Sequence, residues 1–204
     1  MLPENKLRNI LLDLALIPVH GPWSRAVKLE YLQLENPQPL WAGGSVEYGA
    51  RFVPKGGFDS VHLASDPLTA FLEVEAVFQT TQGDLVWDTN APWVWVTAEG
   101  IVDSILDLAD PELWIRLDTS ESELTGNWRN GQDRHLRGEG SLPPTQVLGK
   151  VAYETGRVRG IRYPSAKNTG RGANLVVFPD RLRKGELSYL QVHDPKGSLN
   201  QRIP

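Results

Sequence analysis

The most constraining feature of this sequence is a short strand that leads directly into a capped helix. The run "VHLA" at residues 61–64 is typical of a buried strand. Asp66 then supplies a good N-cap, and Pro67 suits the first helical position. This punctuation predicts a helix from Pro67 to about Gln79. A helix that is apolar nearly all round must be buried.

The order of the remaining elements indicates the fold class. Strands and helices do not alternate strictly, so we expect an α+β fold with a single domain rather than a doubly wound parallel sheet. Capping residues and hydrophobic patterns predict helices at 5–17, 111–117, 120–124 and 145–155. Strand formers predict strands at 23–34, 93–101, 160–165 and 172–180, with a possible last strand at 187–192 and a polar loop at 127–144.

Composition narrows the class of protein. The 204 residues include no cysteine, which excludes disulfides, thiol catalysis and cysteine-based zinc sites and fits a cytoplasmic protein. The net charge of −4 argues against a general nucleic-acid binder. The chain lacks a run of about 18 apolar residues, so no membrane association is expected. Asp13 interrupts the apolar run near the start, which we interpret as an amphipathic helix and not a signal peptide.

Common motifs for catalysis and cofactor binding are absent. The sequence contains no GxGxxG after a strand, no P-loop, no HExxH and no GxSxG, and its four histidines lack metal-ligand spacing. We therefore expect no metal and no bound cofactor. The segment 157–172, "RVRGIRYPSAKNTGRG", is basic. It suits a phosphate-bearing ligand, and a solvated loop explains it equally well.

Two glutamates interrupt the apolar helix expected at residues 67–79. On a helical wheel, Glu73 and Glu75 lie at the two borders of its apolar face. Burial of an unpaired carboxylate costs several kcal/mol, so at least one of them should face a cleft or meet a cation. Taken alone, the pattern favours Glu73 as a border residue that reaches solvent.

Five segments in order resemble the RES domain family. They are "YGARFVPKGG", "VHLASDPLTAFLEV", "PTQVLG", "GIRYPSA" and "GANLVVF". The resemblance covers roughly residues 21–180, with an N-terminal helical extension over 1–20 and a C-terminal extension over 181–204 packed on the same domain. It implies a mixed or antiparallel β core with flanking helices, similar to ADP-ribosyltransferases of the diphtheria-toxin type.

The family is named for an Arg, a Glu and a Ser, and the resemblance assigns these to Arg51, Glu73 and Ser165. It selects Glu73 over Glu75 as the catalytic acid, with Arg51 as a second catalytic residue. Taken without the resemblance, Arg51 also fits a surface arginine and Ser165 a turn serine.

Two further NAD-binding positions follow from the resemblance, Arg25 and His62. His62 stands where the family usually has Tyr. A histidine there can stack on a ring, and it brings a group that titrates near neutral pH.

RES proteins are typically toxins of bacterial toxin–antitoxin pairs, so the resemblance implies depletion of NAD by cleavage of its nicotinamide–ribose bond, through hydrolysis or phosphorolysis. A carboxylate stabilises the oxocarbenium-like transition state, and arginines suit the pyrophosphate. Ser165 would donate to phosphate or ribose. NAD is then a substrate and not a cofactor.

The resemblance also implies a partner, an Xre-type helix-turn-helix antitoxin that covers the active site and through which any DNA contact would be made. The chain would form a hetero-oligomer with it or a homodimer. Two other functions remain open: ADP-ribosyl transfer to a specific protein, and a catalytically impaired module that only binds the antitoxin.

Overall fold

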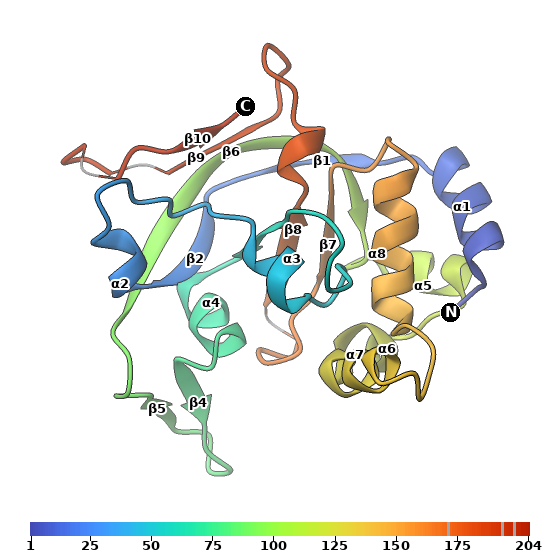
Figure 1. Cartoon of the computed structure of the whole chain (residues 1–204), viewed down its shortest axis with the longest axis horizontal. Helices are drawn as coiled ribbons and strands as arrows, with labels where there is room; N and C mark the ends of the chain where they lie inside the picture. The colour runs from blue at the N-terminus through green and yellow to red at the C-terminus, as the bar shows by residue number, and fades with distance from the viewer. Residues whose placement is uncertain (171, 193, 198) are drawn as a thin grey trace.

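The computed structural model describes residues 1–170, 172–192, 194–197 and 199–204. It is a single α+β domain built on one eight-stranded sheet (Figure 1). The helices are α1 (Glu4–Asp13), α2 (Leu29–Leu32), α3 (Gly44–Tyr48), α4 (Pro67–Glu73), α5 (Pro111–Leu117), α6 (Glu121–Thr125), α7 (Trp128–Leu136) and α8 (Pro144–Glu154). The strands are β1 (Ile17–His20), β2 (Trp23–Lys28), β3 (Val61–Ala64), β4 (Val77–Gln79), β5 (Leu85–Trp87), β6 (Trp93–Asp107), β7 (Gly160–Pro164), β8 (Ala173–Val177), β9 (Tyr189–Val192) and β10 (Arg202–Ile203).

The sheet closes on itself through the long strand β6. Its strand order is β10-β9-β6-β2-β3-β8-β7, and β7 also pairs with β6, in parallel. β1 and β9 pair with β6 as well, so this strand joins both ends of the chain to the centre. The helices α1, α5, α6, α7 and α8 gather on one side of the sheet, while α3 and α4 lie across its front in Figure 1.

Both terminal segments belong to the main body of the domain. Leu7 and Leu11 of α1 are fully buried in the largest hydrophobic cluster, together with residues of α5, α6, α8 and β7. β9 and β10 extend the main sheet. A second cluster, which includes Val61 and Leu63, packs on the other face of the sheet.

The N-terminal helix ends earlier than the sequence pattern predicts. We expect it to reach residue 17, and it ends at Asp13, with Leu14 in an extended conformation. Residues 17–20 form β1 because they pair with β6. The Arg157 guanidinium donates to the carbonyls of Leu11 and Leu12, which satisfies groups that a helix end leaves open.

Other boundaries also differ from expectation. The predicted strand at 23–34 ends at Lys28 and gives way to α2, and the predicted strand at 93–101 continues to Asp107. The predicted loop at 127–144 contains α7, whose N-cap Asn127 accepts a hydrogen bond from the Asn130 backbone. None of the helices in the described ranges is long and apolar enough to cross a membrane.

The helix predicted over 67–79 starts where expected and ends at Glu73. The Asp66 carboxylate caps it through the Thr69 backbone, at 2.8 Å. Beyond Glu73 the chain turns, Glu75 takes a positive φ of 59°, and residues 77–79 pair with 85–87 in the hairpin β4–β5. The helical wheel therefore applies to Glu73 but not to Glu75.

Candidate active site

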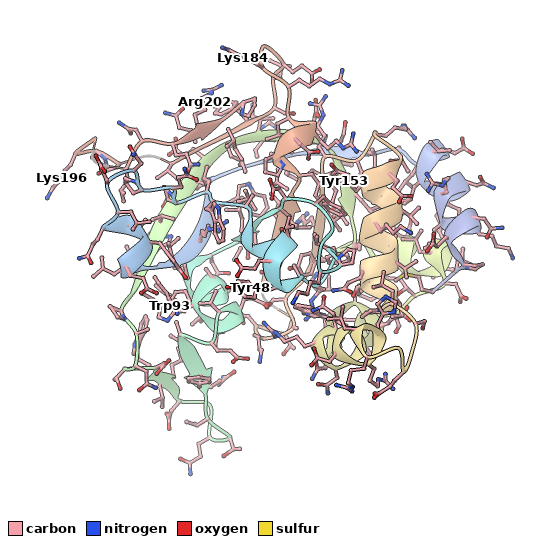
Figure 2. All side chains as sticks on the ribbon, in the orientation of Figure 1. Tyr48, Trp93, Tyr153, Lys184, Lys196 and Arg202 are labelled. Atoms are coloured by element: carbon pink, nitrogen blue, oxygen red, sulfur yellow. The ribbon has the colours of Figure 1, made fainter. Side chains whose placement is uncertain are left out.

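A cavity of about 460 Å³ opens where β2 and β3 separate. These strands pair at a single position, Ser24 with Ala64, and diverge beyond it. Helices α3, α4 and α7 contribute the remaining walls, and Tyr48 at the end of α3 is labelled in Figure 2. Four of the five residues selected from the sequence line this cavity: Arg25, Arg51, His62 and Glu73.

Glu73 is the last residue of α4, and one of its oxygens is held by three donors. Oε1 accepts from Ser165 Oγ at 2.6 Å and from Asn174 Nδ2 at 2.7 Å. The Ala166 backbone N–H donates to the same oxygen at 3.2 Å. Within the described residues no hydrogen bond to Oε2 is found. The carboxylate is therefore fixed in orientation while Oε2 is left for a ligand in the cavity.

Ser165 positions Glu73 and does not line the cavity. It is 1% exposed, and its hydroxyl proton is committed to Glu73. The same oxygen accepts from the backbone N–H groups of Lys167 and Asn168, at 3.2 Å and 2.9 Å. A direct contact between this hydroxyl and a phosphate or ribose, as expected from the sequence, does not fit this geometry because the hydroxyl is buried and fully engaged.

Glu75 has a different environment. Its side chain is 52% exposed and forms an ion pair with Lys167 Nζ at 3.1 Å. Glu75 is therefore a solvated residue that meets a cation, whereas Glu73 faces the cavity. Glu73 lines the cavity and Glu75 does not, and Glu75 lies outside the helix in which both were expected.

Arg25 is a half-buried cation with an unused donor. Its Nη2 donates to the Trp41 carbonyl at 2.8 Å, while its Nη1 is buried and has no hydrogen-bond partner among the described residues. Burial lowers the pKa of the Arg25 guanidinium to about 10, so the group remains charged at neutral pH. An unpaired buried donor on a charged group favours an anionic ligand in the cavity.

Arg51 is partly committed to the protein itself. Its Nη1 donates to the carbonyls of Leu124 and Gly126, both at 2.8 Å, at the C-terminal end of α6. Burial lowers its pKa, and the nearby Tyr163 and Glu73 partly oppose this effect. Arg51 thus joins α6 to the cavity wall and also supplies positive charge close to Glu73.

His62 stays neutral at physiological pH. Burial lowers its pKa to about 4, and the positive charges of Arg25 and Arg51 add to the effect. Its Nε2 shares a hydrogen bond of 2.9 Å with Ser60 Oγ. The expectation that this histidine titrates near neutral pH is wrong for this reason. His62 offers the cavity an uncharged aromatic ring.

A buried pair of amides fixes the segment that carries Arg51. Gln146 Nε2, from α8, donates to the Ala50 carbonyl and to Gln132 Oε1, each at 2.8 Å. Gln132, from α7, in turn donates to the Tyr48 carbonyl at 3.0 Å. The two glutamines therefore hold residues 48–51 against α7 and α8.

The sequence profile of the RES domain matches residues 22–199, which is most of the chain. The chain belongs to the RES domain family. The matched range extends beyond the C-terminal limit at 180 expected from the motifs, and it includes β9.

A solved structure has a similar fold. The chain is similar to one in the crystal structure of the M. tuberculosis MbcT–MbcA toxin–antitoxin complex, with 19% sequence identity and a TM-score of 0.66. The alignment covers 93% of this chain and 90% of that one. A search of curated protein sequences found no match.

Two residues that the sequence analysis did not select, Tyr163 and Asn174, also line the cavity. Tyr163 and Asn174 are register partners on β7 and β8, so their side chains lie on the same face as Ala64, the partner of Asn174 on β3. Burial, followed by the charge of Glu73, raises the pKa of Tyr163, so its hydroxyl stays protonated. The strands were predicted, but their pairing, which brings these residues to Glu73, is not encoded locally.

The basic segment at 157–172 does not form one patch. Arg157 and Arg159 lie together near α1 and β9, where Arg159 pairs with Asp103 and Glu186. Lys167, in contrast, lines the cavity. Arg171, which the sequence analysis included, lies outside the described residues. Among the described residues no cluster of side chains suits a metal ion.

Proposed function

We propose that this RES-domain protein consumes NAD by cleaving its nicotinamide–ribose bond, as the toxin of a toxin–antitoxin pair. The observation that carries the proposal is Glu73, whose Oε1 is held by three donors inside a cavity that also contains Arg25 and Arg51. The fixed anion, Glu73, suits a ribosyl centre that becomes cationic during the reaction. The two arginines suit the negatively charged pyrophosphate.

The proposed reaction breaks the bond between the nicotinamide nitrogen and the ribose C1′. Both bonding electrons leave with nicotinamide, which becomes neutral, and positive charge develops on C1′ and the ring oxygen. Glu73 Oε2 stabilises that charge more in the transition state than in the ground state, where the charge is still on the pyridinium. Water then bonds to C1′ and loses a proton, which gives ADP-ribose. If phosphate attacks C1′ instead of water, the product is ADP-ribose that carries the new phosphate on C1′.

Nicotinamide release by the purified protein tests this proposal. We expect release by the wild type and a loss of about 10²–10³-fold in kcat for Glu73→Gln, because removal of one transition-state charge partner has effects of this size. Glu75→Gln is the matched control and should retain activity, because Glu75 is exposed and lies outside the cavity lining. Reactions with and without phosphate distinguish phosphorolysis from hydrolysis.

Two outcomes would contradict the proposal: no nicotinamide release by partner-free wild type, or equal rates for wild type and Glu73→Gln. Release of nicotinamide only when a protein acceptor is added would instead assign ADP-ribosyl transfer.

The proposed partner is a helix-turn-helix antitoxin. The support is the family match and the likeness to a chain from a toxin–antitoxin complex. If the antitoxin covers the cavity, then addition of the purified partner should suppress nicotinamide release. Suppression in proportion to the amount of complex formed is the expected result, and undiminished release by the complex would oppose it.

A further inference from the structure

A separate cavity, of about 450 Å³, lies at the other end of β7 from the candidate active site. Arg159 precedes β7, whereas Ser165, which holds Glu73, follows it. Antiparallel pairing of β7 with β8 brings Arg159 to the same edge of the sheet as the short 3₁₀ helix Pro179–Arg181. We call this space the arginine cavity. Its described lining includes four arginines, one carboxylate and a single apolar side chain, namely Arg157, Arg159, Arg181, Arg183, Asp180 and Leu16.

Two of the arginines form no ion pair among the described residues. Arg157 donates to the carbonyls of Leu11 and Leu12 at the end of α1, and Arg181 Nη2 donates to the Tyr153 carbonyl, at the end of α8, at 3.1 Å. The C-terminal ends of the two helices attract these cations and hold them in place before any ligand arrives. Hydrogen bonds to neutral carbonyls leave the formal positive charges without a carboxylate partner.

The other two arginines are only partly neutralised. Arg159 pairs with Asp103 at 2.9 Å and with Glu186. Arg183 has a side chain that is 78% exposed and lies 3.9 Å from the same Glu186. With Asp180, three carboxylates stand against four guanidiniums, so the charged side chains at the cavity have a positive sum.

The arginine cavity has no open aromatic surface. No aromatic side chain is among its described lining residues. The adjoining Tyr153 ring has Phe58 stacked on it, with ring centres 3.9 Å apart, and the Arg181 guanidinium carbon 4.1 Å from its centre. Two groups this close occupy opposite faces of the ring. A nucleobase therefore finds nothing to stack on, and the cavity favours a ligand recognised by charge and hydrogen bonds.

Ser104 adds a free hydroxyl to the wall. Between its pairs with Val19 and Ile17, β6 has one more residue than β1, and within this bulge Ser104 takes a positive φ of 57°. Bulges re-aim side chains, and a positive φ is costly for serine. Ser104 lines the cavity, and no hydrogen bond of its hydroxyl is found within the described ranges. The hydroxyl is thus available to a ligand.

We propose that the arginine cavity binds a di- or triphosphate group. Planar guanidiniums match phosphate oxygens in pairs, and the Ser104 hydroxyl donates to the same group. The cavity has the size of an ordinary small-molecule site, about 300–1,000 Å³. Inorganic triphosphate and a nucleoside triphosphate share this chemistry. The site is independent of the proposed function because Glu73, Arg25 and Arg51 line the other cavity. An acidic protein segment is the competing occupant.

Binding of inorganic triphosphate to the full chain, measured by calorimetry, is the test. We expect wild type to bind it and Arg181→Gln to bind it about 10-fold or more weakly, the effect of losing a hydrogen bond to a charged group. Lys184→Gln is the matched control. Lys184 is the exposed neighbour of Arg183, labelled at the top of Figure 2, and is outside the cavity lining. This control should bind as wild type does.

A second variant protects the test against misfolding of Arg181→Gln. Because Arg183 is largely exposed, Arg183→Gln should fold normally and weaken triphosphate binding about 2- to 5-fold, the effect of an exposed charge pair. Both arginine variants should release nicotinamide at the wild-type rate if the proposed reaction occurs, because neither residue lines the candidate active site.

Arg25→Gln separates the two cavities. Triphosphate binding by this variant should persist, since Arg25 is absent from the arginine cavity. In the same variant, ATP should bind about as tightly as triphosphate if no base is recognised. Much tighter binding of ATP would contradict recognition without a base, and displacement of triphosphate by an equal concentration of sulfate would contradict selectivity for a di- or triphosphate.

Three results would overturn the site itself. They are no binding of triphosphate by wild type, equal weakening in Lys184→Gln and Arg181→Gln, and binding that is lost in Arg25→Gln but kept in Arg181→Gln. The first would favour an acidic protein segment as the occupant, the second a diffuse surface charge, and the third the candidate active site. None of these results depends on whether the chain cleaves NAD.

Discussion

His62 lies on β3 in the wall of the candidate active site, where the positive charges of Arg25 and Arg51 act on it. Sequence resemblance identifies this position as a departure from the usual Tyr but does not give its protonation state. Its pKa depends on burial and on two arginines that are 37 and 11 residues away in the chain. The structure shows that the substitution keeps an uncharged ring at this position.

The low pKa of His62 makes stability depend on pH. The imidazole has a pKa of about 6.5 in the unfolded chain and about 4 in the folded one. Above 6.5 both states are neutral, and between 6.5 and 4 only the unfolded state takes up the proton, so the free energy of unfolding decreases as pH falls. The full loss, reached near pH 4, is up to about 3 kcal/mol.

Urea unfolding at pH 7, 6, 5 and 4 checks this prediction. His62→Gln should lose less stability than wild type across this range, because Gln does not titrate. His135→Gln, at an exposed position on α7, should follow the wild-type curve. If His62→Gln also shows the full wild-type decrease, the carboxylates and not His62 account for the pH dependence.

At the scale of elements, the sequence predicts where the helix α4 begins better than where it ends. The start of α4 is marked by Asp66 and Pro67, which act locally. Its end depends on residues 77–79, which could continue the helix by periodicity but pair with 85–87 instead. Likewise, α7 was expected as a loop because its sequence is polar, and its one buried residue, Gln132, is held by Gln146 and Tyr48. Tertiary partners decide both cases.

Gly49 and Gly56 provide a test of the amide pair that holds the Arg51 segment. Both have φ of 77°, but a Cβ at Gly49 would lie 2.0 Å from Gln132 Oε1, whereas a Cβ at Gly56 would meet nothing within 4 Å. Gly56→Ala should cost only the backbone strain, about 1–2 kcal/mol. Gly49→Ala should cost at least about 1 kcal/mol more, for two reasons. With ψ of 164°, Gly49 lies in a backbone region that is nearly exclusive to glycine, and Gln132 must move, which weakens its buried hydrogen bonds.

Urea unfolding of the two glycine variants measures this difference, and nicotinamide release shows whether the Arg51 segment has shifted. Equal stability losses in Gly49→Ala and Gly56→Ala would mean that Gln132 yields freely and does not hold the segment.

For the whole molecule, the sequence indicates an α+β domain but not how the sheet closes. β6 pairs with β1 and β2 from near the start of the chain and with β7 and β9 from its last quarter. The candidate site depends on that closure, because Glu73 is held by Ser165 and Asn174, which lie about a hundred residues later. Local patterns could therefore mark Glu73 as unusual, while the family resemblance had to connect it with Ser165. Neither source indicated Asn174 or Tyr163.

Because Glu73, Arg25 and Arg51 line one cavity, we expect the whole chain to act as an enzyme in cells and not only as a module that binds a partner. Induced expression in a bacterial host without the antitoxin should lower total NAD several-fold and stop growth. Glu73→Gln, expressed to the same soluble level, should leave both unchanged, and Glu75→Gln should behave as wild type because its carboxylate is exposed and outside the cavity lining. Extracted NAD and growth rate are the two measurements. Normal growth and normal NAD with soluble wild-type protein would favour the binding module, and growth arrest at constant NAD would point to ADP-ribosylation of a specific protein.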